Sequence, residues 1–173
     1  TFSITDNGDW GLGEDSVING SGSFKLIQSN LLLTGTGDGA SIGENIDFQM
    51  HAGNITNPGK LTVLGDMLWS GGNISCGDLS FSANSIVTAN GSTDVLRSSG
   101  SGYIRNYGHF ILSAGIGSGD IHYQNKAGAT FEFTSGSGFW HGGGGSGPSS
   151  LVNDGLLLKT GDSSCSLNQL NTT

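Results

Sequence analysis

The stretch Ile104-Arg105-Asn106-Tyr107-Gly108, followed after one residue by Phe110-Ile111-Leu112, carries the pattern on which the fold prediction rests. It reads aliphatic, any residue, asparagine, any residue, glycine, and then an apolar strand. Two other stretches share this order, with asparagines 49 residues before and 47 residues after Asn106: Ile55-Thr56-Asn57-Pro58-Gly59 before Leu61-Thr62-Val63, and Leu151-Val152-Asn153-Asp154-Gly155 before Leu156-Leu157-Leu158. A looser copy around Asn125 precedes Phe131-Glu132-Phe133. The chain is therefore internally repetitive.

The repeat predicts a parallel β-solenoid with about 20 residues per coil, in which each strand pairs with its counterpart one coil away, about 4.8 Å along the axis. An inward asparagine at a bend can bond buried backbone groups and stack on the asparagine of the next coil. A following glycine can accept the positive φ of a tight corner. The predicted corners are Asn57, Gly59, Asn106, Gly108, Asn125, Asn153 and Gly155. The alternative is that these residues form ordinary turns of a β-sandwich.

Composition favours an all-β domain with almost no helix. Glycine supplies 32 of the 173 residues, and charged residues make up only 12%. No stretch keeps apolar residues at helical spacing for three turns without a glycine. Short alternating runs such as Ile46–Met50 and Phe131–Phe133 place apolar side chains on one face of a strand. With 34% hydrophobic residues, the chain has enough apolar surface to form a core.

A second set of phrases carries a resemblance. Leu61-Thr62-Val63, Trp69 to Ser75 and Leu79-Ser80-Phe81, followed by Ile104-Arg105-Asn106, resemble the strand repeats of large bacterial surface proteins. The nearest architectures are filamentous-haemagglutinin-like proteins and autotransporter passengers, and the match covers roughly residues 55 to 167. The resemblance implies a right-handed parallel β-helix with a scaffold or adhesion role. Residues 1–173 are then one solenoid segment, part of a longer repetitive protein or of a fibre.

Charge excludes several partners. The net charge is −8, and the six basic residues are scattered along the chain, so we expect no nucleic-acid binding. No apolar run approaches the roughly 20 residues of a membrane span, so we expect no membrane insertion. Low charge together with abundant Gly, Ser, Thr and Asn is typical of extracellular, secreted or cell-surface proteins.

Catalytic and metal sites receive little support. Asp120, His122 and Glu132 are the best acid-containing cluster, while Arg97 and Arg105 have no acid-rich neighbourhood in the sequence. We therefore expect no catalytic residues and no cofactor. Oxygen ligands gather near the start of the chain, where Asp6, Asp9, Glu14 and Asp15 are candidates for calcium, although no EF-hand loop is present.

Three further groups of residues are candidates for modification or binding. Cys76 and Cys165 are 89 residues apart, about four coils, too far for a disulfide between them; they are expected to be free or to form an intermolecular disulfide. Sequons place candidate N-glycosylation at Asn19, Asn54, Asn73, Asn90 and Asn171. Trp69 and Trp140, each near a glycine pair, are candidates for stacking on glycans, although a role in the core is the alternative.

The sequence therefore predicts an extracellular structural or adhesive module, not an enzyme, that associates with itself or with neighbouring repeats at its open ends. Two alternatives remain at this point. One is a glycan-binding module with exposed aromatic residues, and the other is a β-helix enzyme that acts on polysaccharide.

Overall fold

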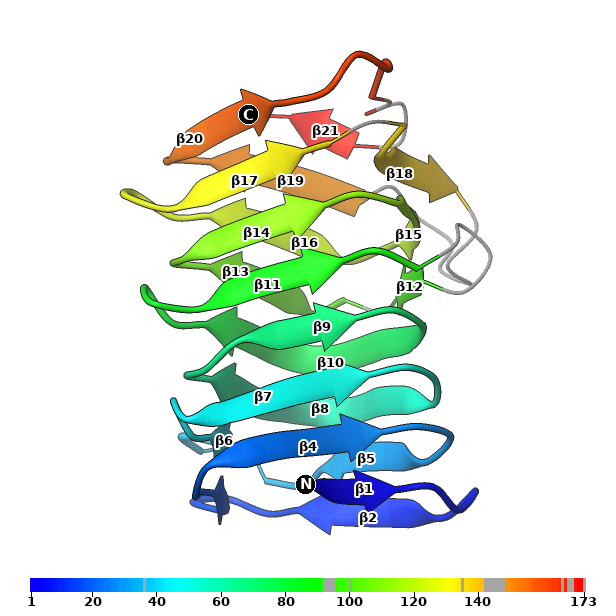
Figure 1. The fold of residues 1–173 in the computed structure, drawn as a ribbon, viewed down its shortest axis with the longest axis vertical. Coiled ribbons are helices and arrows are strands. Elements are labelled where there is room, and N and C mark those ends of the chain that lie inside the picture. Colours follow the sequence, from blue (N-terminus) through cyan, green and yellow to red (C-terminus); the bar gives the residue numbers. More distant parts are fainter. Residues whose placement is uncertain are drawn as a thin grey trace.

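The structure, a computed structural model, describes residues 1–173 except 36, 92–95, 100, 135, 142–148, 166, 168–169 and 173. Its described residues form strands, turns and bends, with no helix among them. All strand pairs are parallel, and the strands stack into a column (Figure 1). The prediction of an all-β parallel β-solenoid is confirmed.

One face of the column is an eight-stranded sheet, here called the first face. Each coil contributes one strand to it, and the strands follow one another along the axis in sequence order. They are β1 (Phe2–Ile4), β4 (Gly22–Leu26), β7 (Ile46–Met50), β9 (Met67–Trp69), β11 (Ile86–Ala89), β14 (His109–Leu112), β17 (Thr130–Phe133) and β20 (Leu156–Lys159).

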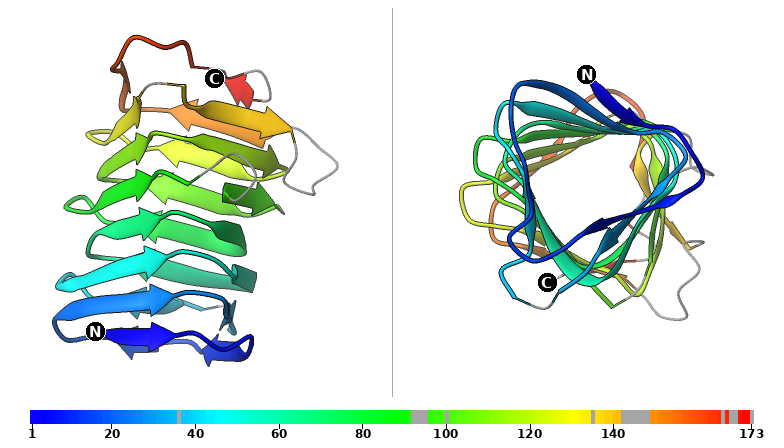
Figure 2. Two further views of the ribbon diagram at one scale, coloured as in Figure 1. Left: turned by 45° about the vertical axis from the view of Figure 1, so that its right-hand side comes forward. Right: turned by 90° about the horizontal axis from the view of Figure 1, so that it is seen from below.

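The remaining thirteen strands form one sheet that bends into two further faces, so the cross-section is roughly triangular (Figure 2). Two long strands, β8 (Asn54–Val63) and β10 (Gly72–Phe81), run through both of these faces. The second face also contains β2 (Asp9–Leu12), β5 (Asn30–Leu33), β12 (Leu96–Ser99), β15 (Gly115–Gly119) and β18 (Gly138–His141). The third also contains β3 (Val17–Ile18), β6 (Ala40–Ile42), β13 (Tyr103–Asn106), β16 (His122–Asn125), β19 (Ser149–Asn153) and β21 (Leu170–Thr172).

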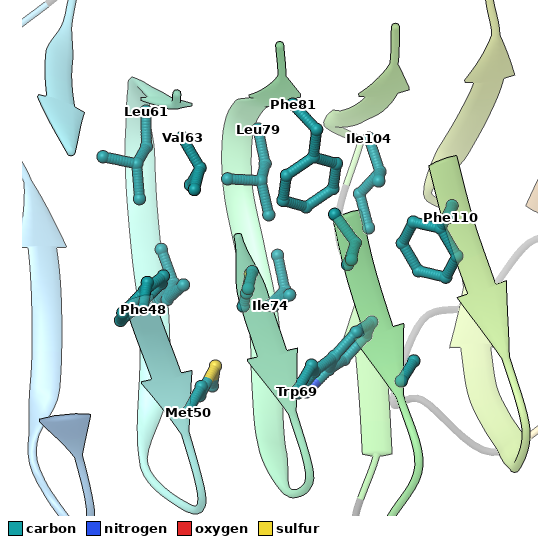
Figure 3. Close-up of a cluster of buried hydrophobic side chains, with 14 of the residues drawn as sticks. Phe48, Met50, Leu61, Val63, Trp69, Ile74, Leu79, Phe81, Ile104 and Phe110 are labelled. Atoms are coloured by element: carbon teal, nitrogen blue, oxygen red, sulfur yellow. The ribbon is translucent and has the colours of Figure 1, made fainter. Parts of the chain in front are cut away.

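The core is a set of axial columns of apolar side chains inside the three faces (Figure 3). Strand alternation sends every second side chain inward, and the parallel register places it on its counterpart in the next coil. On the first face one such column is Phe2, Phe24, Phe48, Met67, Val87, Phe110, Phe131 and Leu157. The rings of Phe24 and Phe48 are stacked with centroids 5.3 Å apart, and those of Phe110 and Phe131 are 4.7 Å apart. This continuous core makes each coil depend on its neighbours.

Three of the four predicted asparagine corners stack on one another. Asn106 donates from Nδ2 to Asn125 Oδ1 at 2.8 Å, and Asn125 donates to Asn153 Oδ1 at 2.7 Å. The same amides also donate to corner carbonyls: Asn106 to Thr130 O at 2.8 Å and Asn125 to Leu156 O at 3.1 Å. Asn106 and Asn125 are buried, so this ladder satisfies polar backbone groups that water cannot reach.

The fourth asparagine belongs to another corner, which corrects the prediction that all four lie above one another. Asn57 lies within β8, and its partner in the next coil is Cys76. The residue of β8 that occupies the column of Asn106 is Val63, through Phe81 of β10. Asn57 and Gly59 therefore mark the bend between the second and third faces, whereas Asn106 marks the bend between the third and first.

The role predicted for the corner glycines is also wrong. Gly59, Gly108 and Gly155 do not have a positive φ. A side chain is excluded for another reason: a Cβ on Gly108 would lie 2.3 Å from Ser85 O, and one on Gly155 would lie 2.4 Å from Ala129 O. The chain of one coil passes so close to the carbonyls of the preceding coil that only glycine fits.

Candidate functional site

Outward side chains of the third face form two parallel columns that cross β8, β10, β13, β16 and β19. Between the two columns runs a buried one, Leu61, Leu79, Ile104, Tyr123 and Leu151, so strand alternation fixes their outward direction. Together they form the outer polar face, whose members are Lys60, Asp78, Tyr103, His122 and Ser150 in one column and Thr62, Ser80, Arg105, Gln124 and Val152 in the other.

Arg105 lies at the centre of this outer polar face. Its Nε donates to both carboxylate oxygens of Asp78, at 3.0 and 2.9 Å, and its Nη1 donates to Gln124 Oε1 at 2.9 Å. Its Cζ atom lies 4.5 Å from the centroid of the Tyr103 ring, a cation–π contact. The side chains of Arg105 and Asp78 are still 25% and 18% exposed. The guanidinium is thus held in one orientation while part of it faces solvent.

A second contact extends the face toward the later coils. His122 Nδ1 lies 2.8 Å from Ser150 Oγ, and its ring centroid is 5.3 Å from that of Tyr103. An equal distance separates His51 Nδ1 from Ser70 Oγ elsewhere in the solenoid. Because stacking of coils produces this contact at two places, it does not single out a catalytic serine–histidine pair. The outer polar face offers cationic groups, hydrogen-bonding groups and one aromatic ring in a fixed arrangement.

The sequence shows no acid-rich neighbourhood around Arg105, but one carboxylate reaches it from another coil. Asp78 is 27 residues earlier in the chain, and the register of β10 with β13 brings it beside Arg105. Sequence reasoning missed this network because its members are neighbours only across coils. The spacing of the repeats was the available signal, but it requires the corner lengths to be known.

Comparisons of the chain with protein-family models, with curated proteins and with solved structures gave no match. The β-solenoid therefore rests on the structure itself, and the relation to haemagglutinin-like or autotransporter proteins stays a prediction. None of the described residues belongs to a helix long and apolar enough to cross a membrane.

The predicted acid-containing cluster does not form, because Glu132 lies on a different face from Asp120 and His122. Glu132 is on the first face, in β17, whereas His122 is on the third face and Asp120 lies in the corner before β16, with φ of 61°. Glu132 instead accepts from Thr160 Oγ1 at 2.5 Å and lies 2.8 Å from His109 Nε2. These two contacts, the Thr160 hydrogen bond first, hold the pKa of Glu132 below its ordinary value.

Trp69 is not a platform for sugars, which corrects that prediction. It has 0% exposure and lies in a core column between Met50 and Ala89 (Figure 3). Its Nε1 is buried and has no hydrogen-bond partner among the residues that the structure describes. Trp140 pairs through its backbone with Gly117, on the second face, so the two tryptophan–glycine motifs are not structural equivalents. The side chain of Trp140 lies outside the described part of the chain.

The two cysteines differ in environment, and neither forms a disulfide in the structure. Cys76 is 3% exposed, and burial raises the pKa of its thiol to about 12. The prediction of an intermolecular disulfide through Cys76 is therefore wrong. A thiol reacts as its thiolate, and the sulfur of Cys76 lies in the core, where burial disfavours the thiolate. Cys165 is partly exposed and packs against the end of the core. An intermolecular disulfide through Cys165 stays a prediction.

The four calcium candidates lie in the first coil. Asp6 accepts from Trp10 Nε1 at 3.2 Å and from Ser29 Oγ at 3.0 Å, and these bonds, Trp10 first, lower its pKa. Asp9 accepts from Asn30 Nδ2 at 2.8 Å. Glu14 and Asp15 are exposed, and Asp15 has φ of 60°. Within the described ranges no three acidic, histidine or cysteine side chains gather as a metal site would require. Calcium at these residues stays a prediction.

The five sequons occupy different settings. Asn19 and Asn90 are exposed beside turns. Asn54 donates from Nδ2 to Asn30 Oδ1 at 2.6 Å, within an outer amide column that continues to Asn73. The side chain of Asn171 is outside the described residues. Glycosylation of any of them stays a prediction, but a glycan on Asn54 would have to replace one hydrogen of an amide that already bonds Asn30.

Proposed function

We propose that this chain is an extracellular structural or adhesive module whose coils associate end to end with those of another copy. The proposal rests mainly on one observation, the exposure of inward-facing aromatic rings in the first coil that the structure describes. Phe2 and Trp10 occupy inward columns, where their partners Phe24 and Leu31 are 1% exposed, yet Phe2 is 55% and Trp10 is 43% exposed.

The exposed rings of the first coil are arranged as part of a core that continues. Phe2 stacks on Phe24 with centroids 5.9 Å apart and meets Trp10 edge to face at 6.2 Å. In the described chain β1 pairs with β4 and β2 pairs with β5, and each leaves its other edge open. Open strand edges beside exposed apolar rings favour pairing with another strand.

The opposite end offers a matching position. Leu157 of β20 continues the column above Phe131 and is 41% exposed. If β1 of a second copy pairs with β20, Phe2 packs on Leu157 and the apolar column continues between copies. After β20, Cys165 and Leu167 pack against the core. The contact with a second copy is therefore made through β20 itself, on the first face. Such a contact between unlike surfaces generates a filament when it does not close into a ring.

The test is sedimentation velocity over a range of protein concentrations, with electron microscopy of the concentrated sample. We expect reversible growth in particle length with concentration. Trp10→Asp should abolish it, because a carboxylate in the inward column cannot be buried in the contact. Val17→Asp is the matched control: Val17 is 60% exposed in the same coil but pairs with the outward Ser41.

Circular dichroism should show that both variants keep the parent strand content. A parent protein that stays monomeric at the highest concentration would contradict the proposal, as would equal loss of association in the two variants.

A further inference from the structure

The outer polar face has a formal charge of +1, from Lys60 and Arg105 against Asp78 with histidine taken as neutral, in a chain whose net charge is −8. Lys60, Arg105 and His122 lie along it, and Asp78 is the acid that its two columns contain. Asp120 lies in the corner before β16, outside the columns. Since opposite charges attract and the rest of the chain is acidic, a soluble anion would be directed to this face.

Arg105 is suited to hold a carboxylate. The guanidinium has five N–H donors, and the bonds to Asp78 and Gln124 use one on Nε and one on Nη1, which leaves three. Asp78 and the Tyr103 ring fix its orientation before any ligand arrives. A group that is already ordered loses less conformational entropy on binding, so its contact contributes more to affinity.

The spacing of Lys60, Arg105 and His122 indicates an extended ligand. In the stack of strands, Lys60 lies two strands before Arg105, about 10 Å away along the axis, and His122 lies one strand after Arg105, about 5 Å away. A small anion reaches only one of them. A polymer that runs along the solenoid axis reaches all three.

The neutral members of the face indicate a ligand rich in hydroxyl groups. Ser80, Gln124 and Ser150 offer donors and acceptors alongside Lys60 and Arg105, and Thr62 adds another hydroxyl in the same column as Arg105. Two cations, Lys60 and Arg105, are few for nucleic acid, which requires many phosphate contacts and which the overall charge repels.

We infer that the outer polar face binds an acidic polysaccharide, with sugar carboxylates on Lys60 and Arg105 and sugar hydroxyls on His122 and the other polar side chains of the two columns. This site is separate from the open end of the first coil. The inference does not depend on end-to-end association, and the Trp10→Asp variant should bind the polysaccharide as the parent does.

The experiment is calorimetric titration of the parent protein with an oligogalacturonate, with a neutral gluco-oligosaccharide of equal length as the comparison. We expect saturable binding of the oligogalacturonate that weakens as salt increases, and no binding of the neutral sugar. Arg105→Gln and Lys60→Gln should each weaken binding about tenfold, a change of ~1.4 kcal/mol. Lys60 is exposed, so its replacement tests the face without disturbing the Asp78 network.

Lys25→Gln is the matched control, because Lys25 is an outward lysine of the first face. It should bind as the parent does. Absence of saturable binding would overturn the inference, and so would equal affinity for the neutral sugar or a loss in Lys25→Gln as large as in Lys60→Gln. Binding of a sulfated oligosaccharide without binding of the oligogalacturonate would overturn the assignment to carboxylates.

Discussion

The bend between the third and first faces is built in two ways in the early and late coils. In the early coils its inward column consists of Ile42, Val63 and Phe81, and in the later coils of Asn106, Asn125 and Asn153. In the early coils, serine side chains from the bend at residues 82–85 supply hydrogen bonds to backbone carbonyls. Ser85 Oγ donates to Val63 O at 3.1 Å, and Ser82 Oγ donates to Leu64 O at 2.8 Å.

In the late coils the asparagine side chains replace those serines. Asn106 Oδ1 accepts from Gly108 N at 3.1 Å, and Nδ2 donates to the next coil. The comparison shows that the inward position at this bend accepts either a polar or an apolar side chain. What it requires is that the carbonyls and N–H groups of the corner find partners, either from the column or from the turn.

The largest effect expected is from Asn125→Leu, the middle of the asparagine column. Leucine removes the acceptor of Asn106 and the donor to Asn153 and Leu156 O in a buried setting. Buried partners left unpaired cost about 1–3 kcal/mol each, so we expect a loss of ~3–5 kcal/mol in the free energy of unfolding. Urea denaturation followed by circular dichroism measures it. Gln124→Leu, the adjacent outward position, should lose less than about 1 kcal/mol; comparable losses would show that the column contributes nothing particular.

A reciprocal exchange tests the early coils. Val63→Asn places an amide between Ile42 and Phe81, where no asparagine lies above or below it and the corner carbonyls already accept from serines. We expect a loss of ~2–4 kcal/mol, from buried amide groups without partners and from lost apolar contact. Val63→Ala separates the two causes, since it removes the apolar contact alone. An asparagine variant as stable as the alanine variant would refute the distinction between the two regions.

Trp69→Phe probes the last coil before the asparagines begin. Phenylalanine leaves space against Ala89, but it also removes the buried indole N–H, which has no partner in the described part of the chain. The two effects oppose each other, so we expect a loss of only about 1 kcal/mol, compared with ~3–5 kcal/mol for Trp69→Ala. Thermal denaturation of the pair gives the difference. A phenylalanine variant as unstable as the alanine variant would mean that the indole N–H is satisfied in solution.

The smallest effect concerns pH and a late-coil contact on the first face. Because the pKa of Glu132 is lowered in the folded protein, its contribution to stability is present above the ordinary glutamate pKa, near 4.5, and is lost as pH falls through the folded value. In Glu132→Gln, the free energy of unfolding should therefore differ less between pH 7 and acidic pH than it does in the parent protein. Asp47→Asn, at an outward acid of the early coils, is the control. Denaturation midpoints of the two variants against pH provide the measurement, and identical pH profiles for Glu132→Gln and the parent would contradict the expectation.

Local alternation was sufficient to predict individual strands. Phe131-Glu132-Phe133 and Ile46–Met50 both lie as predicted, with apolar residues buried and polar ones outward. The same rule predicts a buried Trp69, because Met67 and Trp69 are two residues apart in one strand and therefore both point inward. The interpretation of the glycine pair beside Trp69 as a mark of an exposed ring ignored that alternation.

Alternation within a strand does not predict the register, that is, which residue of one coil pairs with which residue of the next. Along the sequence, neighbours in one third-face column are 18 residues apart for Val63 and Phe81 but 28 residues apart for Asn125 and Asn153. A change of this size shifts which asparagine meets which, and so Asn57 was assigned to the wrong corner. The neighbours of Arg105 were missed for the same reason, since Asp78 and Gln124 are 27 and 19 residues away.

The sequence by itself determined that the chain is all-β, repetitive and coiled, because strand alternation, glycine spacing and recurring asparagines are local properties that each short segment expresses. Only the tertiary structure decided which residues became neighbours. Hydrogen bonding between coils fixes the register, and the register placed Asp78 beside Arg105, set Val63 in the column of Asn106 and enclosed Trp69 and Cys76 in the core. Contacts of that kind depend on the summed lengths of all the intervening turns, which no single segment specifies.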